Sequence, residues 1–333
     1  MRPGARGVSG WATGRPLRVK VPGAGTDRRS MGDPDFPLDL LACPACGDPL
    51  ELGPAGLACA GCATAYGRAA GGPWDLRLRG PKGVTVEHVV GRALLPAGAP
   101  PPDFGPLAPH PQPAFAFDPA ELPTHLSPAM ASHLPTPSRD GAACLDLGCG
   151  GGAYRAPLER LGYRWCGVDF SNPRAPLWGD VHALPFRDGA FELVVSLAVL
   201  EHVQFPSVAL REVARVLEPG GTFFGSVAYL VPFHSQSFYN MTHLGAYSAL
   251  ADAGFRVGFV AADPVYLGIR ALAYTGMFLG RSRRLAYAVV EPIVRLQKAW
   301  WAWKRRRGSR AHSRERESQL TTGAFVFAAT KPP

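Results

Sequence analysis

The sequence lacks the long apolar segments that would place it inside a membrane. No uncharged apolar run reaches the roughly 18 residues that a helix needs to span a bilayer. Residues 1–35 carry several arginines but no apolar run of signal-peptide length, so we expect a disordered basic tail rather than a targeting segment. Internal repeats are also absent from the sequence. We therefore expect a cytoplasmic protein.

Charged residues are sparse, at 18%, whereas hydrophobic residues make up 47% of the 333 residues. This composition supplies enough apolar side chain for a core and excludes wholesale disorder. The length suggests about two domains. Lys and Arg number 35 against 26 Asp and Glu. The basic excess favours an anionic partner, such as nucleic acid, an anionic membrane surface or a phosphorylated substrate.

Four segments follow one another along the chain: the tail 1–35, a compact cysteine-bearing segment 36–80, a proline-rich connector 81–140 and an alternating region 141–333. In the last of these, strand-like apolar runs alternate with segments of helical spacing. This pattern predicts an α/β fold with a doubly wound, mostly parallel sheet. The predicted strands are Ala142–Leu147, Tyr163–Val168, Phe191–Leu197, Thr222–Ala228, Phe255–Val260 and Gly323–Thr330, and the predicted helices are Tyr154–Leu161, Pro206–Leu217 and Leu244–Ala253.

Residues 264–308 interrupt this alternation before the last strand. They are apolar and aromatic with interspersed arginines, and Trp300, Trp301 and Trp303 precede four consecutive basic residues. We predict two inserted amphipathic helices here. Two interpretations stay open, a packed helical cap with a solvated basic end, and peripheral contact with a membrane surface.

Four cysteines form two C-x-x-C pairs, Cys43 with Cys46 and Cys59 with Cys62, separated by twelve residues. Each pair can sit on a tight turn and direct two thiolates at one point, and two such turns give the closed tetrahedral site that structural zinc prefers. A segment this small also needs more than burial to hold its fold. Two disulfides or a redox dithiol are the alternatives. The cytosolic expectation disfavours disulfides, and the presence of two C-x-x-C pairs disfavours a single redox dithiol. We predict a structural zinc ion.

A glycine-rich loop around Gly148 and Gly150 follows the first predicted strand of the alternating region and opens a helix. Asp169 ends the next strand, at the distance where an acidic residue receives a ribose in nucleotide-binding folds. Asp146 precedes the loop, and a carboxylate there repels a pyrophosphate but suits the ammonium group of a methionine moiety. This favours S-adenosylmethionine over a dinucleotide as the ligand.

Residues 141–260 resemble the class I S-adenosylmethionine-dependent methyltransferases, of the type that includes the ubiquinone/menaquinone methyltransferases. The resemblance implies a Rossmann-like, seven-stranded sheet. The cysteine-bearing segment and the stretch from Tyr66 to Leu76 resemble the zinc-ribbon domains that precede some methyltransferases. The matching stretches of the larger region are residues 145–150, 167–171, 179–186, 191–203 and 212–221.

The resemblance implies a role for several residues. Asp146, Gly148 and Gly150 would line the methionine end, and Ser196 and Leu197 would flank the sulfonium. Around the nucleoside, Asp169 would accept hydrogen bonds from the ribose hydroxyls, Phe170 would lie beside the adenine, Asp180 would accept from the adenine amino group, and the Val181 N–H would meet a ring nitrogen. One departure is the short interval from Asp169 to Asp180 with its two prolines, Pro173 and Pro176. It predicts that the family's helix at this place is shortened or lost.

Methyl transfer needs a base only where the acceptor must lose a proton. His202, after the fourth strand, is the first candidate. His234, Tyr239 and His243 follow in a polar, aromatic loop after the fifth strand. Each of the four groups also has a structural alternative, such as capping a helix or bonding the backbone.

Three functions compete. The first is a methyltransferase acting on a small-molecule, lipid or glycan-linked acceptor. The second is a ribosomal RNA guanine-N1 methyltransferase, which the order of zinc ribbon and methyltransferase resembles and which the basic charge would suit. The third is a non-catalytic binding or scaffold module, which the set of Asp146, Asp169 and Asp180 disfavours.

Overall fold

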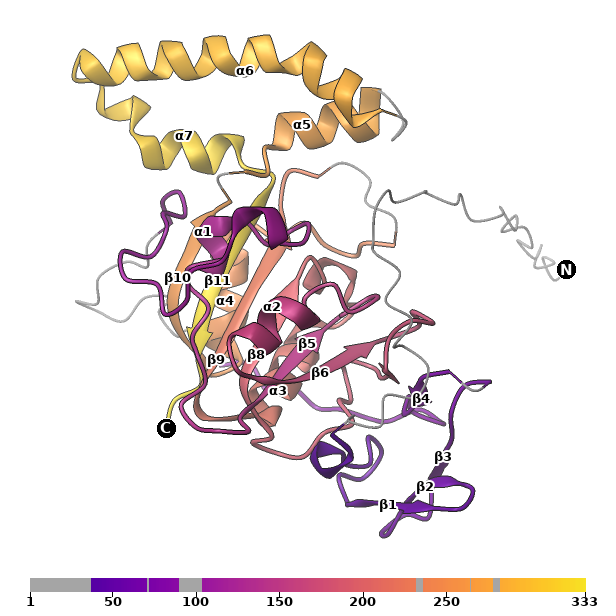
Figure 1. Cartoon of the computed structure of the whole chain (residues 1–333). Helices are drawn as coiled ribbons and strands as arrows, with labels where there is room; N and C mark the ends of the chain where they lie inside the picture. The colour runs from indigo at the N-terminus through magenta and orange to yellow at the C-terminus, as the bar shows by residue number, and fades with distance from the viewer. Residues whose placement is uncertain (1–36, 71, 90–103, 232–235, 264, 278–281) are drawn as a thin grey trace, which may run out of the picture.

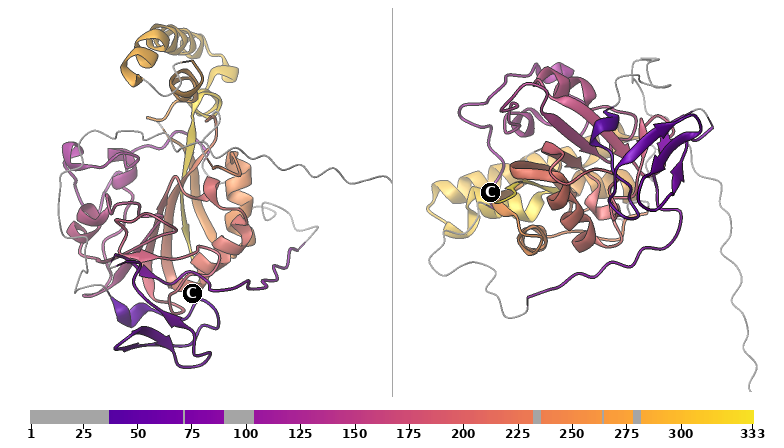
Figure 2. Two further views of the ribbon diagram at one scale, coloured as in Figure 1. Left: turned by 90° about the vertical axis from the view of Figure 1, so that its right-hand side faces the viewer. Right: turned by 90° about the horizontal axis from the view of Figure 1, so that it is seen from below.

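The computed structural model describes residues 37–333 apart from 71, 90–103, 232–235, 264 and 278–281 (Figure 1). The predicted basic tail, part of the predicted connector and His234 lie outside the described residues. The fold is built on one large sheet with helices packed on both of its faces (Figure 2). This confirms the predicted α/β class.

The large sheet has eight strands in the order β10-β11-β9-β8-β5-β6-β7-β4. All neighbouring strands from β9 to β4 are parallel, whereas β11 runs antiparallel to both of its neighbours. Seven of the strands come from the alternating region, and the eighth, β4, comes from the cysteine-bearing segment. The strands are β4 (Trp74–Asp75), β5 (Ala143–Leu147), β6 (Arg164–Asp169), β7 (Leu177–Trp178), β8 (Phe191–Leu197), β9 (Leu217–Ala228), β10 (Arg256–Ala262) and β11 (Ala324–Thr330).

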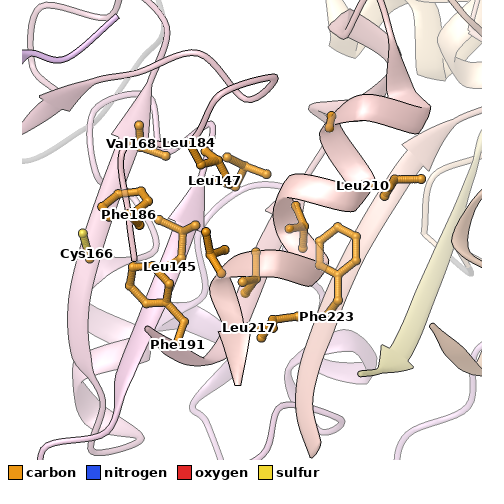
Figure 3. Close-up of a cluster of buried hydrophobic side chains, with 14 of the residues drawn as sticks. Leu145, Leu147, Cys166, Val168, Leu184, Phe186, Phe191, Leu210, Leu217 and Phe223 are labelled. Carbon is orange, nitrogen blue, oxygen red and sulfur yellow. The ribbon is translucent and has the colours of Figure 1, made fainter. Parts of the chain in front are cut away.

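Burial on both faces explains why the central strands are apolar almost throughout rather than alternating. In β5, Leu145 and Leu147 point into one hydrophobic cluster, with α3 (Pro206–Val216) and α4 (His243–Asp252) (Figure 3). Cys144 points into a second cluster on the opposite face, with α1 (Pro128–Ala131) and α2 (Arg155–Arg160). The period-two geometry of a strand thus gives each face its own core.

Helix α3 shows how sequence positions one element. Pro206 occupies its first turn, where the missing N–H costs nothing. Ala209, Leu210, Val213 and Val216 recur at helical spacing and are buried against the sheet. The chain then continues directly into β9, which starts at Leu217, the residue predicted to end the helix and five residues before the predicted strand.

The cysteine-bearing segment is attached to the large sheet rather than separate from it. After η1 (Leu38–Leu40), strands β1 (Leu50–Gly53), β2 (Gly56–Cys59) and β3 (Ala65–Tyr66) form a small antiparallel sheet. Strand β4 then pairs in parallel with β7. Leu41, Tyr66 and Leu76 belong to the same buried cluster as the core of the large sheet.

Part of the predicted connector also packs on the sheet. Residues 104–140 contain η2 (Pro119–Glu121) and α1, and Leu107, Leu126 and Met130 are buried in the second cluster. The predicted loss of the helix between β6 and β7 is confirmed. Residues 170–176 form turns, closed in part by a hydrogen bond from Trp178 Nε1 to the Asn172 carbonyl.

The insertion before β11 is helical, as predicted, and stands at one end of the sheet (Figure 1). It contains a third α-helix beyond the two that the sequence indicated. None of the helices in the described part of the chain is long and apolar enough to cross a bilayer. The elements are α5 (Gly268–Leu272), the π-helical turn η4 (Ala273–Met277), α6 (Arg283–Arg306), η5 (Arg310–His312) and α7 (Arg314–Thr321).

Candidate functional site

A cleft of about 1160 Å³ opens at the carboxyl ends of β5, β6 and β8. In open parallel sheets this edge is where ligands bind. Its walls include five of the residues that the resemblance assigned to the cofactor: Gly148, Asp169, Phe170, Asp180 and Val181. His202, the first candidate base, also lines it.

The glycine loop after β5 is held against the end of β6. Gly148 and Gly150 have φ of +73° and +54°, in the left-handed region that glycine adopts readily. A side chain at Gly148 would place its Cβ 2.4 Å from Val199 Cγ2, so glycine also lets the loop pack against the end of β8. The Gly150 N–H donates to Asp169 Oδ2 at 3.0 Å.

Asp169 is the hub of this turn. Besides the Gly150 N–H, its carboxylate accepts the N–H groups of Ser171 and Asn172 through Oδ1. Three backbone donors fix the orientation of the carboxylate at the wall of the cleft. Since a carboxylate offers about four lone-pair positions, acceptor capacity remains for a hydroxyl group.

Asp180 belongs to a short hydrogen-bonded relay. The Phe205 N–H donates to His182 Nε2 at 3.1 Å, so His182 carries its proton on Nδ1 and donates to Asp180 Oδ1 at 2.6 Å. Burial raises the pKa of Asp180, but the hydrogen bonds from His182 outweigh it and leave the pKa below its ordinary value. Both hydrogen bonds fall on Oδ1. The Val181 N–H, next along the chain, makes no hydrogen bond within the described residues.

Asp146 lies beneath the glycine loop, not on the wall of the cleft. It is 1% exposed and accepts a hydrogen bond from Trp165 Nε1 at 3.2 Å. Burial raises the pKa of Asp146 to about 7. A cationic group brought near this carboxyl would favour its ionised form.

The predicted sulfonium neighbours, Ser196 and Leu197, are both buried at the end of β8. Neither lines the cleft, and Ser196 Oγ has no hydrogen-bond partner among the described residues. Ala198 and Val199, the next two residues, do line it. Ala198 has φ of +57°, and a strained non-glycine residue at the end of a central strand is typical of functional sites.

The three candidate bases that lie among the described residues have different surroundings. His202 borders the cleft beside Phe238. Tyr239 donates its hydroxyl to the Gln204 carbonyl at 3.0 Å, which favours the structural alternative for this residue. His243 begins α4 and packs edge-on against Phe104, and burial lowers its pKa.

Glu201, next to His202, is a buried carboxyl that sequence reasoning did not assign. It is 1% exposed, and neither of its side-chain oxygens has a hydrogen-bond partner among the described residues. Burial raises its pKa to about 7. Its carbonyl accepts the N–H groups of Phe238 and Tyr239, which ties the loop after β9 to the end of β8.

The end of the cysteine-bearing segment and the start of the predicted connector supply one wall of the cleft, which the sequence did not indicate. Leu78, Lys82 and Val84 follow β4 and line the cavity. Arg77 is held by Asp75 and lies over the rings of Trp178 and Phe170, with its guanidinium carbon 4.6 Å and 5.7 Å from their centroids. The Lys82 ammonium donates to the Pro44 carbonyl, inside the first C-x-x-C turn, at 2.8 Å.

The four cysteine sulfurs converge at the opposite end of this segment, all within 4.8 Å of one another. Cys43 and Cys62 Sγ are 3.7 Å apart, and Cys46 and Cys59 Sγ are 3.3 Å apart. These distances are longer than the ~2.05 Å of a disulfide bond and are nearer the ~3.8 Å edge of a tetrahedron with 2.3 Å metal–sulfur bonds. The residues present therefore fit a zinc ion.

The two C-x-x-C turns share one backbone design. Gly47 and Ala63 each follow a turn with positive φ, +87° and +57°, and their N–H groups donate to the carbonyls of Cys43 and Cys59. Thr64 hydrogen-bonds the Cys62 sulfur and lowers its thiol pKa to about 6, which favours the thiolate that binds a metal.

Three observations indicate that the cleft fits S-adenosylmethionine. Its volume exceeds what a nucleoside alone would fill, an oriented carboxylate and an unpaired N–H border it, and Phe170, 59% exposed, offers an aromatic face to an adenine. Several lining residues were not assigned from the sequence. His182 stands in a matched stretch and could have been suspected there, but Leu78, Lys82 and Val84 reach the site only through strand pairing.

Comparisons with known proteins bear on the same region. The family model described as a methyltransferase domain matches residues 145–225. A ubiquinone biosynthesis O-methyltransferase from Caulobacter vibrioides is 31% identical over 137 residues, which cover 34% of this chain and 52% of the relative. The chain thus spans about half the length of this curated relative. A protein of Streptomyces fradiae encoded in transposon TN4556 is 36% identical over 101 residues, 25% of this chain and 29% of its own.

Solved structures were compared as well. A complex of the Haloferax volcanii Trm112 methyltransferase activator with a methyltransferase matches at 25% identity and a TM-score of 0.41, covering 61% of this chain and 88% of that one. An S-adenosylmethionine-dependent methyltransferase from Mesorhizobium loti matches at 17% identity and a TM-score of 0.39, covering 62% and 98%.

Proposed function

We propose that the chain carries a class I S-adenosylmethionine-dependent methyltransferase domain and transfers a methyl group by SN2 displacement to a small-molecule, lipid or glycan-linked acceptor. Bound S-adenosylmethionine supplies an electrophilic methyl group on its sulfonium. The observation that carries the proposal is the pair of oriented carboxylates, Asp169 and Asp180, on one cleft beside a glycine turn.

In this proposal the chain binds and orients the cofactor through groups already held in place. Asp169, fixed by three backbone N–H groups, accepts hydrogen bonds from the ribose hydroxyls. Asp180 and the Val181 N–H receive the polar edge of the adenine, and Phe170 lies against its face. Asp146, buried beneath the glycine loop, favours the ammonium of the methionine end through its charge rather than by direct contact. Preset orientation of this kind lowers the entropic cost of reaching the transferring geometry.

The acceptor side of the cleft lies after β8 and β9. Residues 198–199, 202–205 and 236–238 border it, and apolar side chains such as Val203, Phe205 and Phe238 keep water from the transferred group. His202 is the proposed proton acceptor where the acceptor must be deprotonated. Contact of residues 264–308 with a membrane surface belongs to the same proposal, because a lipid or lipid-linked acceptor would be met there.

The four cysteines hold a structural zinc ion in this proposal. Four thiolates leave no open coordination position, so the metal contributes stability and not catalysis. Metal analysis of the purified, reduced protein should give one zinc ion per chain. Less than one zinc ion with the quartet intact would remove this part of the proposal.

The test of activity is transfer of labelled methyl from S-adenosylmethionine to separate RNA, lipid and polar extracts. We expect label in the lipid or polar fraction, and loss of that label in Asp169→Asn but not in the control Asp140→Asn, since Asp140 is exposed and outside the cleft. Label confined to RNA would favour the ribosomal RNA alternative. S-adenosylhomocysteine binding without label in any fraction would favour a non-catalytic module.

A further inference from the structure

Helix α6 exposes a continuous apolar stripe. Its exposed apolar side chains follow one another at intervals of four, four, three, four and three residues, so they share one face of the helix. Their exposed fractions range from 44% to 72%. The next face along, formed by Ala286, Val290 and Val294, is buried. The residues of the stripe are Leu285, Val289, Ile293, Leu296, Trp300 and Trp303.

The same insertion has a net positive charge almost as large as that of the whole chain. Residues 282–321 contain eleven Lys and Arg against three Glu, an excess of eight, while the whole chain has an excess of nine. Arg284, Arg295, Lys298 and Arg306 lie at intervals of eleven, three and eight residues, on one flank of the helix beside the stripe. Lys304 and Arg307 lie over the ring of Trp303.

We propose that this stripe and its basic flank dock the protein on an anionic lipid bilayer, with α6 lying in the interface. An apolar face bordered by Lys and Arg, with tryptophans at one end, is the pattern of an interfacial helix. At about 1.5 Å per residue, its 24 residues give a docking edge of about 36 Å.

The charge and the apolar surface of α6 together favour an anionic bilayer over a second copy of the chain or RNA. A second copy of the chain would bring two strongly positive helices together, and the repulsion opposes pairing. RNA would satisfy the basic flank but leave the leucine, valine and isoleucine side chains exposed. An anionic bilayer satisfies both, because headgroups meet the cations and acyl chains accept the apolar stripe.

The fold places this surface at the edge of the sheet that also bears the cleft. The insertion joins the carboxyl end of β10 to the start of β11, where Ala324 pairs with Ala228 at the carboxyl end of β9. Strand β9 is parallel to β8, whose carboxyl end borders the cleft. The docking would deliver a membrane-borne acceptor to the cleft, and this purpose rests on the proposed function. Vesicle binding itself does not depend on the proposed function.

The experiment is cosedimentation of the full chain with vesicles of phosphatidylcholine alone and of phosphatidylcholine with about a quarter phosphatidylglycerol. We expect at least about tenfold stronger binding to the anionic vesicles, weakening as salt rises. Leu296→Ser should reduce binding about tenfold, through lost apolar burial. Arg295→Gln should reduce it about fivefold at low salt.

The matched control is Leu52→Ser, on β1 of the small sheet, which alters an apolar residue of similar exposure, 62% against 72% for Leu296. It should bind vesicles as the unmodified protein does. Unchanged S-adenosylhomocysteine affinity in Leu296→Ser would show that the fold is retained.

Absence of binding to both vesicle types would overturn the inference, as would equal binding by Leu296→Ser and the unmodified protein. A dimer that Leu296→Ser dissociates, or salt-sensitive retention on RNA in place of vesicle binding, would overturn it as well. Vesicle binding by a protein that transfers no methyl group would leave the docking surface standing and refute the proposed function.

Discussion

The Asp169 side chain has two roles. It accepts the hydrogen bond from the Gly150 N–H that closes the glycine turn, and it faces the ligand cleft. Two of its three backbone hydrogen bonds come from Ser171 and Asn172, within three residues along the chain, and the third comes from Gly150 in the glycine loop, 19 residues earlier. Asp180 differs, because its orientation depends on His182 and, through it, on the N–H of Phe205 at the start of α3.

His182 is therefore expected to position Asp180. Replacing His182 by Ala removes the side-chain donor to Asp180 Oδ1 and leaves only the backbone N–H of residue 182, so the affinity for S-adenosylhomocysteine should fall by about three- to tenfold, the usual cost of one hydrogen bond. His182→Asn, which keeps a donor, should recover part of the loss. Calorimetric titration measures both. Full affinity in His182→Ala would show that the relay does not act on the cofactor site.

Glu201 gives a pH dependence whose sign follows from its raised pKa. Between its unfolded value of 4.5 and about 7, the folded chain binds more protons at this group than the unfolded chain. The free energy of unfolding should therefore decrease as pH rises through that window, by about 2–3 kcal/mol from this group.

Glu201→Gln should remove this contribution, leaving stability near that of the unmodified protein at pH 5 and raising it at pH 8. Urea denaturation at the two pH values measures the difference, with the exposed Glu51→Gln as control. A variant less stable than the unmodified protein at pH 8 would indicate that the ionised carboxylate has a partner.

At the scale of elements, the central strands and α3 were predictable and the edge of the sheet was not. Strand β8 was predicted with its observed ends because all its residues except Glu192 are buried, which gives an almost continuous apolar run. Strand β4 has only two residues, and its partner β7 lies about one hundred residues later in the chain. No local sequence pattern therefore predicts it. For the same reason the wall of Leu78, Lys82 and Val84 could not be found from the sequence.

The predicted site residues divide in the same way. Gly148, Asp169 and Asp180 were found because each ends a strand or opens a loop of the sheet edge, where position follows from topology. Which residue of Ser196, Leu197 and Ala198 faces the cleft depends on the twist at the end of β8 and the positive φ of Ala198. A strand pattern does not specify those angles.

The contact of Lys82 with the first C-x-x-C turn leads to a metal-dependent prediction. Removing the metal should loosen this turn, and with it the wall that Lys82 and Val84 form. S-adenosylhomocysteine affinity should fall several-fold after chelation and return when zinc is added back. Identical affinity before and after chelation, with metal loss verified, would show that the metal site does not support the wall formed by Lys82 and Val84.

At the scale of the whole molecule, one buried cluster runs from the cysteine-bearing segment into the large sheet. Leu41 pairs with Phe186, and the Ala42 N–H donates to the Pro185 carbonyl, so the two parts share hydrogen bonds as well as apolar contacts. Thermal unfolding of the zinc-loaded protein should therefore show one cooperative transition in calorimetry. Two resolved transitions, the lower one removed by chelation, would contradict a shared core.

The positive charge of the chain is distributed unevenly over the molecule. The basic excess was visible in the composition, but its concentration beside an exposed apolar stripe needed the helix geometry of α6. The composition alone is compatible with any anionic partner. The fold adds an exposed apolar face beside the basic residues, and this combination favours an anionic bilayer over the other anionic partners.

The central claim is that the cleft at the carboxyl edge of the sheet binds the nucleoside of S-adenosylmethionine. Calorimetric titration of the purified protein with S-adenosylhomocysteine tests it most directly. The account predicts one site per chain, with affinity about 10- to 100-fold weaker in Asp169→Asn, the usual range for a hydrogen bond to a charged group, and unchanged in Asp140→Asn. No binding by the folded, metal-loaded protein, or equal affinity in all three proteins, would contradict it.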